Sequence, residues 1–237
     1  MNNKVKEVKK ELKSLNVTEK PKLNVLCMHG YRQNAEQFKN KIGSFRKFLK
    51  PQANFEFINA PHQAKALEEG GEVIEGQCGW WFNQVDGTFN IEQGLGLHGF
   101  DESLKCLEET WQQGNYDGIL GFSQGGSFLS VVCAMSQKSL TPINPKFIIL
   151  VSAFKSVSSQ HDSFYEEKIN IPSLHVSGTS DQVIPHSMHL LLEEAFVDPV
   201  IFHHESGHHL PATVDEKPTY KKFFEEQIKR LYPESLK

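Results

Sequence analysis

The feature that most constrains this chain is the stretch from Tyr116 to Gly126, YDGILGFSQGG, in which an apolar run ends in Gly-x-Ser-x-Gly. A helix-compatible sequence follows directly, from Ser127 to Met135. A serine at this spacing between a buried strand and a helix is typical of a nucleophile elbow, a strained turn that exposes the hydroxyl above the sheet. The pattern therefore predicts that Ser123 is the attacking group in an acyl-transfer reaction.

The glycines on either side of the serine fit the same interpretation. At Gly121 and Gly125 a side chain would collide where the strand and the helix approach each other closely. The unpaired amides and the positive dipole end of the helix favour developing negative charge. The pentapeptide alone arises by chance in roughly one chain in ten of this length, as a serine in a glycine-rich turn. Its position between a strand and a helix is what favours the elbow.

Length and composition narrow the class of protein. The chain has 237 residues, enough for one domain with a sizeable core, and its 38% hydrophobic and 23% charged residues are ordinary for a globular protein. A net charge of -4 gives no argument for binding to nucleic acid or to an anionic membrane. No apolar run approaches the roughly 20 residues that span a bilayer. We therefore expect no nucleic-acid partner and no membrane span, and the oligomeric state stays open.

The N-terminus and the cysteines indicate the compartment. Residues 1–21 alternate lysine and glutamate, so we expect a charged arm without a signal-peptide core, followed by one domain at 22–237. The chain has four cysteines without close pairs, at Cys27, Cys78, Cys106 and Cys133. Reduced thiols and a cytoplasmic location are expected. The sequence has neither a Cys/His zinc pattern nor a phosphate-binding loop, so we expect no metal and no cofactor.

Strands and helices are expected to alternate along the whole domain. Apolar runs predict strands at 22–28, 54–59, 116–120, 145–151, 172–177 and 200–203. Helical spacing predicts helices at 34–49, 100–111, 186–196 and 216–231, besides the one after the elbow. The segment from 62 to 96 has no clean period and is interpreted as a functional loop or lid. The alternation predicts an α/β fold, a mainly parallel sheet with helices on both faces.

An acid follows one of the later strands. In such a sheet the active site forms from loops at the carboxyl ends of the strands. The strand at 172–177 leads into Gly178-Thr179-Ser180-Asp181, which places Asp181 just beyond the sheet edge. A carboxylate there holds the tautomer of a catalytic histidine and stabilises its imidazolium form. The other interpretation of Asp181 is a turn or helix-cap residue.

The loop after the last strand supplies the base. It contains His208 and His209, so the chain order is Ser, Asp, His, as in α/β-hydrolases. A serine hydroxyl needs a neighbouring base to take its proton, and histidine can return that proton to the leaving group. Gly207 allows a tight approach and favours His208, while spacing alone leaves His209 open. The oxyanion hole is expected to use the amides of Gln124 and Tyr31.

Five ordered blocks carry a family resemblance, which covers the chain from about Leu23 to Leu231. They are Leu26–Asn34 (LCMHGYRQN), Gly79–Phe82 (GWWF), Gly121–Gly126 (GFSQGG), Ser152–Lys155 (SAFK) and Ser206–Pro211 (SGHHLP). Together they resemble the "family of serine hydrolases" esterases of the α/β-hydrolase superfamily, which include the ovarian-cancer-associated serine hydrolase type.

The resemblance implies an intracellular carboxylesterase with an α/β-hydrolase fold, with Ser123 as nucleophile, Asp181 as acid and His208 as base. The family pattern before the hydrophobic-Pro pair is Gly-Gly-His, and here the first glycine is Ser206. Lys155 stands where many relatives carry arginine.

The expected substrate is a small-molecule ester with an alkyl or acyl chain. Apolar side chains around the site would suit such a chain, although plain core packing also explains them. The candidates are Tyr31, Trp80, Trp81, Phe82, Phe122, Phe154, Val183 and Ile184. The predicted function is hydrolysis of acyl esters through an acyl-enzyme. The alternatives are an acyl thioesterase and a non-catalytic binding module with the same fold.

Overall fold

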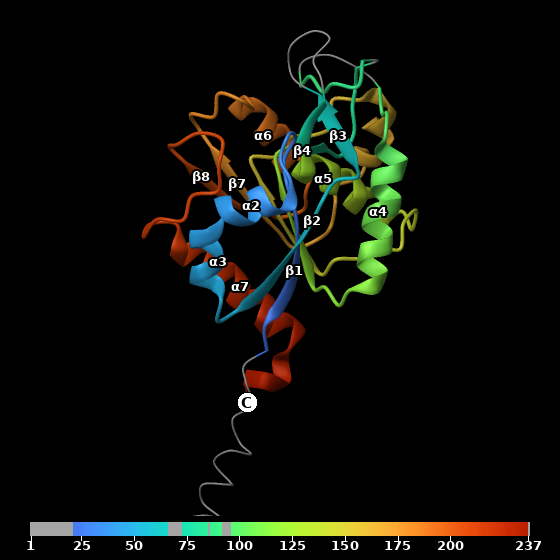
Figure 1. The fold of residues 1–237 in the computed structure, drawn as a ribbon. Coiled ribbons are helices and arrows are strands. Elements are labelled where there is room, and N and C mark those ends of the chain that lie inside the picture. Colours follow the sequence, from blue (N-terminus) through green and yellow to red (C-terminus); the bar gives the residue numbers. More distant parts are fainter. Residues whose placement is uncertain (1–20, 66–72, 85, 92–95, 237) are drawn as a thin grey trace, which may run out of the picture.

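A parallel β-sheet runs through the centre of the protein (Figure 1). The computed structural model describes residues 21–65, 73–84, 86–91 and 96–236. Within these residues the main sheet has six strands in the order β2-β1-β5-β6-β7-β8, and every neighbouring pair is parallel. The strands are β1 (Leu23–Met28), β2 (Ala53–Ile58), β5 (Gly118–Phe122), β6 (Phe147–Val151), β7 (Ser173–Gly178) and β8 (Val200–His204).

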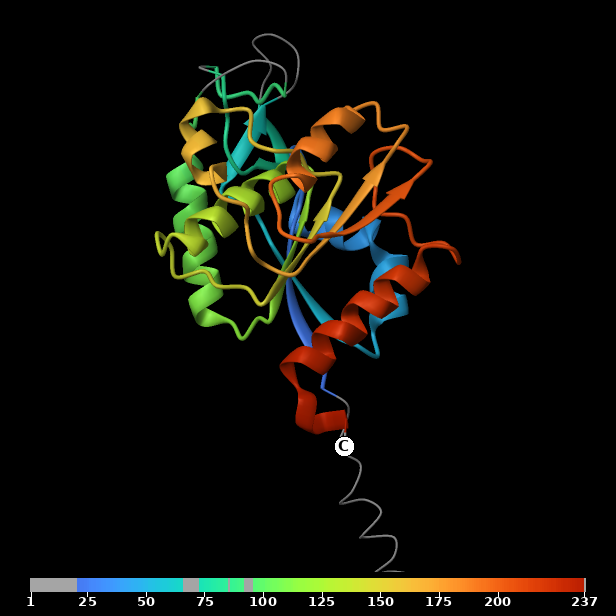
Figure 2. The ribbon, with the colours of Figure 1, turned by 180° about the vertical axis from the view of Figure 1, so that it is seen from behind.

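Helices cover both faces of this sheet, as the two opposite views show (Figures 1 and 2). They are α2 (Ala35–Lys41), α3 (Gly43–Leu49), α4 (Phe100–Gln113), α5 (Gln124–Gln137), α6 (His186–Glu193) and α7 (Lys217–Leu231), with 3₁₀ turns at Ser159–Tyr165 and Pro233–Leu236. The predicted α/β architecture is confirmed.

The sheet separates two hydrophobic cores, and alternate residues of each strand serve opposite sides. In β1, Leu26 and Met28 pack in the core that contains residues of α4 and α5. Val25 and Cys27 pack in the core that contains residues of α2, α3 and α7. This period of two is the ordinary consequence of strand geometry. Because both faces are covered, every residue of β5 and β6 is buried, which explains their continuous apolar sequences.

The strand order reverses between β1 and β5. The chain moves outward from β1 to β2, then returns to the other side of β1 as β5 and continues to β8. In open α/β sheets, ligands bind at such a switch point, outside the carboxyl ends of the strands. The loops after β1 and β5 are therefore neighbours at the place where the fold favours an active site.

The predicted single helix at 34–49 was wrong, because the structure has two helices there. Asn34 caps the first, accepting a hydrogen bond from the amide of Gln37. The break falls at Ile42, which is buried, and Gly43 begins the second helix. Glycine is a weak helix former, so the chain bends at this point while the apolar side chains of both helices stay on the sheet.

The long segment after residue 62 contains two strands that the sequence did not predict. β3 (His62–Lys65) and β4 (Val73–Gly79) form an antiparallel pair apart from the main sheet. The sequence of β4, VIEGQCG, lacks the alternation that reveals a strand. Cys78 of β4 exchanges backbone hydrogen bonds with Arg32 and Gln33, both 2.8 Å long, which joins this pair to the loop after β1. Residues 66–72, 85 and 92–95 of the segment lie outside the described residues.

Two further expectations concern the N-terminal arm and the absence of a membrane-spanning helix. The charged arm predicted at 1–21 lies outside the described residues except for Pro21. Among the helices of the described ranges, none has the length and apolar character needed to cross a membrane.

A pair of glycine substitutions tests how the elbow and the α2–α3 break constrain the fold. At Gly121 a Cβ would lie 2.6 Å from the Cα of Gly126 and 2.8 Å from the carbonyl oxygen of Gly125, whereas at Gly43 nothing lies within 4 Å. Gly121→Ala should lower the free energy of unfolding by about 2–3 kcal/mol. Gly43→Ala should raise it by about 0.5 kcal/mol. Urea denaturation measures both, and an unchanged midpoint for Gly121→Ala would contradict the steric argument.

Candidate active site

Ser123 occupies a strained turn between β5 and α5. Its backbone has φ 53° and ψ -120°, a conformation that is costly for a residue with a side chain and persists only where the surroundings enforce it. The amide of Ser123 donates to the carbonyl of Val151 at the end of β6, and its carbonyl accepts from the amide of Ser127 in the first turn of α5. The hydrogen bonds on both sides therefore hold this backbone in place.

The elbow lies against the loop after β1. A Cβ on Gly125 would lie 2.4 Å from the carbonyl oxygen of His29, and a Cβ on Gly30 would lie 3.1 Å from the Cβ of Ser123. Only glycine fits at Gly125, because the atom that it would meet is backbone. The close approach brings the loop that carries Tyr31 beside the serine.

A buried polar clamp fixes this loop to the end of β4. The indole N–H of Trp80 donates to the carbonyl of His29 at 2.7 Å, and the backbone amide of Trp80 donates to Oε1 of Gln124 at 2.9 Å. Nε2 of Gln124 donates to the carbonyl of Trp81 at 2.8 Å. The side chain of Gln124, the residue after Ser123, therefore connects the elbow, the GWWF block and the loop after β1.

His29 is a structural member of the clamp. Its Nδ1 donates to the carbonyl of Gly30 at 2.7 Å, while its Nε2 accepts from the amide of Ala60 at 3.0 Å. Burial lowers the pKa of His29 to about 4. The ring is therefore neutral near pH 7, with its hydrogen on Nδ1. The sequence did not single out this histidine, since nothing in its spacing differs from an ordinary strand-ending turn.

Asp181 lies in the loop between β7 and α6 with its carboxylate fully buried. Oδ1 accepts from the amides of Val183 at 2.8 Å and Ile184 at 2.9 Å. Oδ2 accepts from Nδ1 of His208 at 2.7 Å. Burial alone would raise the pKa of Asp181, but its interactions with His189, His208 and the amide of Ile184 outweigh burial and lower that pKa well below its usual range. The carboxylate is ionised at neutral pH.

The two adjacent histidines of the last loop have different partners. His208 is bonded to Asp181, and its ring lies 4.9 Å from that of Phe122, the residue before Ser123. His209 lies 3.4 Å from the hydroxyl of Ser206, which also bonds Nδ1 of His204 at 2.7 Å. The structure therefore brings Asp181 and His208 together beside the elbow, and turns His209 elsewhere.

The apolar candidates for the substrate site differ in exposure. Trp80 and Trp81 are fully buried and pack on Phe128, so both belong to the core in this structure. Four others are also buried, namely Phe82, Phe122, Phe154 and Ile184. Val183 is 56% exposed.

Phe89 joins several of these side chains and was not singled out from the sequence. Its ring lies 5.7 Å from Tyr31, 5.1 Å from Trp81 and 6.0 Å from Phe154. It is partly exposed, and it comes from the long segment without a clean period. Only the folded structure reveals that this aromatic residue meets the others.

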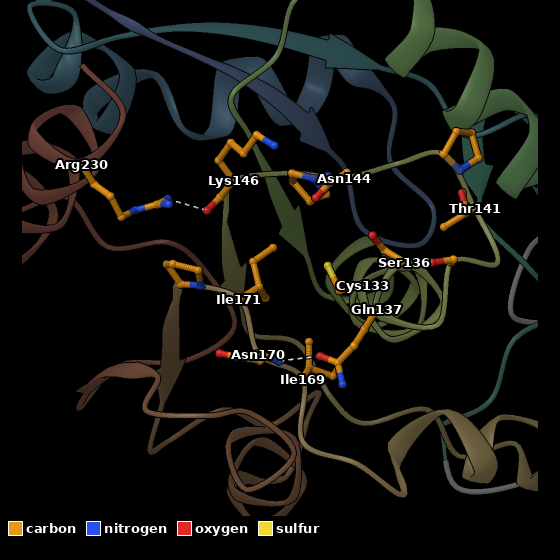
Figure 3. Close-up of a pocket in the computed structure, with 14 residues that line it drawn as sticks. Cys133, Ser136, Gln137, Thr141, Asn144, Lys146, Ile169, Asn170, Ile171 and Arg230 are labelled. Carbon is orange, nitrogen blue, oxygen red and sulfur yellow. Dashed lines mark hydrogen bonds between the residues drawn. The ribbon is translucent and has the colours of Figure 1, made fainter. Parts of the chain in front are cut away.

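A separate cleft lies at the opposite end of the sheet (Figure 3). It is lined by residues that precede β6 and β7 and by the ends of α5 and α7, including Lys146, Cys133 and Arg230. Two of its polar side chains are used within the fold: Arg230 donates to the carbonyl of Lys146, and Gln137 accepts from the amide of Asn170. Ser123, Asp181 and His208 all lie at the other edge. In the part of the chain that is described, no group of three acidic, histidine or cysteine side chains is arranged to hold a metal.

Comparisons with known proteins show which sequences and structures this chain resembles. Residues 17–220 match the family described as Serine hydrolase (FSH1). Esterase CG5412 of Drosophila melanogaster is 48% identical over 222 residues, which cover 93% of this chain and 78% of the relative. Esterase OVCA2 of Danio rerio is 40% identical over 217 residues, which cover 85% of this chain and 96% of the relative.

Solved structures share the fold at much lower sequence identity. Arabidopsis thaliana SOBER1 superposes with a TM-score of 0.61 and 18% identity over 88% of this chain and 100% of its own. The Bacillus cereus carboxylesterase has a TM-score of 0.57 and 16% identity over 92% of this chain and 98% of its own. At this identity the likeness establishes the α/β-hydrolase fold alone.

The lowered pKa of Asp181 predicts a pH-dependent contribution to stability. A carboxyl whose pKa is lower in the folded state stabilises that state fully above its unfolded pKa of about 3.9, and the contribution is lost as the pH falls below this value. Asp181→Asn should therefore lower the free energy of unfolding by about 2 kcal/mol at pH 7, and by less at pH 3. Urea denaturation at both pH values measures the difference.

The exposed Asp162 provides a matched control, because Asp162→Asn should leave the free energy of unfolding unchanged at either pH. A loss for Asp181→Asn that is equally large at pH 7 and pH 3 would contradict the prediction.

Proposed function

The chain belongs to the serine hydrolase (FSH1) family and is an esterase, and from this premise we propose that it is a serine carboxylesterase that cleaves acyl esters through an acyl-enzyme on Ser123. The observation that carries the proposal is the 2.7 Å hydrogen bond between Nδ1 of His208 and Oδ2 of Asp181, with the His208 ring against Phe122, the residue before the strained serine. This arrangement has the parts that a Ser-His-Asp triad requires.

In the first half of the reaction, Ser123 becomes acylated. Because Nδ1 of His208 donates to Asp181, Nε2 of the same ring is free to accept the proton of the serine hydroxyl. Oγ of Ser123 then attacks the ester carbonyl carbon, whose oxygen takes up the negative charge. When this tetrahedral intermediate collapses, His208 returns its proton to the leaving alkoxide, and an alcohol departs.

In the second half, water releases the acid. His208 takes a proton from a water molecule, which attacks the acyl carbonyl and forms a second tetrahedral intermediate. Its collapse breaks the bond to Oγ of Ser123, and the imidazolium returns the proton to the serine. The products are a carboxylic acid and an alcohol, and the chemistry requires no cofactor.

Two backbone amides are suited to stabilise the oxyanion. Gln124 is the first residue of α5, and its amide precedes the hydrogen-bond ladder of the helix. Tyr31 follows Gly30, in the loop that contacts the elbow, and the amides of Arg32 and Gln33 are used within the fold. Both amides are preorganised by the Trp80 clamp, so the charge develops against fixed donors.

The partly exposed aromatic residue Phe89 and its neighbours Tyr31 and Phe154 favour an apolar acyl chain. Phe122, Ile184 and Val183 flank the triad residues in sequence and extend the apolar surroundings. Apolar side chains around a few convergent polar groups are typical of small-molecule sites. The proposed substrate class is therefore alkyl-chain esters.

Covalent labelling tests the nucleophile. A fluorophosphonate probe should label the protein, and Ser123→Ala should abolish the label because no other oxygen is activated by His208. Ser152 gives a matched control, since it also follows a buried strand at the same sheet edge and has φ 46°. Ser152→Ala should keep the label. A label that survives in Ser123→Ala would overturn the proposal.

A series of p-nitrophenyl esters of increasing acyl length tests the substrate class. Phe89→Ala should reduce kcat/KM about tenfold for an eight-carbon acyl chain, because the lost contact corresponds to burial of roughly two methylene groups. The acetyl ester should be affected much less. Phe55 is a matched control, a partly buried aromatic residue in the core on the other face. Equal losses on all chain lengths would contradict an acyl-binding role for Phe89.

A further inference from the structure

His189, on α6, points its ring at the candidate acid. Its side chain is 2% exposed, and Nε2 lies 3.6 Å from Oδ2 of Asp181. On its other side, Nδ1 lies 2.6 Å from the carbonyl oxygen of Ala153, which follows β6 by two residues. A carbonyl only accepts, so Nδ1 of His189 must carry a hydrogen. The state of Nε2 is then the one open question about this ring.

The carboxylate of Asp181 indicates whether Nε2 of His189 carries a hydrogen. It is buried and ionised, and its neutral donors are the amides of Val183 and Ile184 and the ring of His208. A buried charge is costly unless it is paired. If Nε2 of His189 lacked a hydrogen, its lone pair would face an anionic oxygen inside the protein, without a hydrogen-bond donor among the described residues. A proton on Nε2 converts this repulsion into attraction.

We propose that His189 is a positioning residue that carries a proton on both ring nitrogens and forms a buried ion pair with Asp181. The inference rests on the proposed function, which makes Asp181 the acid of the triad. His189 would link the acid to the carbonyl of Ala153, and thus to the end of β6, where the carbonyl of Val151 holds the amide of Ser123. Asp181 and Ser123 are then both linked to the carboxyl end of β6.

The other titratable groups around His189 leave Asp181 as its counter-ion. On α6, Glu193 is bonded to His203 of β8 at 2.9 Å, and the ring of His186 lies 6.2 Å from that of His189. His175 of β7 lines the same small cavity as His189 and Glu193, and burial lowers the pKa of His175 to about 3. Among the described carboxylates, that of Asp181 is the one within 4 Å of a His189 nitrogen.

The ion pair changes the chemistry of the base. In a triad the carboxylate attracts the imidazolium that forms on the base. A fixed positive charge on His189 offsets part of this attraction, since both rings lie against the same Oδ2 of Asp181. The positively charged form of His208 is then stabilised less than it would be beside an unpaired carboxylate. The esterase would keep its activity further into the acid range.

Two substitutions at His189 separate its charge from its hydrogen bonds. Asparagine places an amide donor near the position of Nδ1 and can keep the bond to Ala153, whereas glutamine places one near Nε2 and can keep a neutral donor to Asp181. Both remove the charge. In each variant, the acid limb of kcat/KM for an acetyl ester should move to higher pH by about one to two units, as expected when a neighbouring charge is lost at an effective dielectric of about 20.

The matched control is His175→Gln, which removes a neutral buried imidazole from the same cavity and should leave the acid limb where it is. An acid limb that stays at its wild-type position in both His189 variants overturns the inference. A shift in His189→Asn without one in His189→Gln shows that a neutral donor suffices, and overturns the charge.

A second measurement does not depend on the variants being folded. The ¹⁵N spectrum of the intact protein, labelled at its histidines and assigned through side-chain correlations, should show two protonated nitrogens on His189 at pH 7. An unprotonated Nε2 overturns the inference. Failure of the proposed function gives a different result, because Ser123→Ala would then keep its kcat/KM and its fluorophosphonate label.

Discussion

The approach of two backbone segments at the switch point of the sheet is the constraint on which the rest of the site depends. Gly125 lies so close to the carbonyl of His29 that a Cβ would come within 2.4 Å of that oxygen. This contact sets the elbow after β5 against the loop after β1, and the strained φ of Ser123 follows from the same turn. The Trp80 and Gln124 hydrogen bonds then stabilise a geometry that sterics has already selected. The same contact and hydrogen bonds hold the proposed oxyanion amides rigidly in place.

The strands, and the order in which the candidate site residues occur along the chain, could be predicted from the sequence because each depends on local signals. Runs such as Phe147–Val151 are continuously apolar because both faces of the strand are covered. The order Ser123, Asp181, His208 follows from reading the loop after each strand. The choice between His208 and His209 could not be made by spacing, since adjacent residues differ only in which way the folded loop turns them. In the structure, one meets Asp181 and the other meets Ser206.

What the sequence could not predict depends on partners that are distant along the chain. Trp80 and Trp81 were candidates for the substrate site because they are aromatic. In the structure both rings are buried, and the two N–H groups of Trp80 donate to His29 and Gln124. β4 gave no signal because its glycines interrupt the alternation, and it is held by backbone bonds to Arg32 and Gln33. The contacts of Phe89 with Tyr31 and Phe154 likewise could not be predicted, because these residues are far apart in the sequence.

With the proposed ion pair, two equally buried histidines differ in charge because the partners of their second nitrogens differ. His29 and His189 are both almost fully buried, and each donates Nδ1–H to a carbonyl. At His29 the amide of Ala60 occupies Nε2 as a donor, which requires a lone pair there and hence a neutral ring. At His189 the corresponding nitrogen faces the carboxylate of Asp181, which requires a hydrogen. Under this proposal the same residue type, equally shielded from water, is neutral beside the loop after β1 and cationic beside Asp181. This difference suits the proposed chemistry, because the buried carboxylate that needs a counter-ion is that of Asp181.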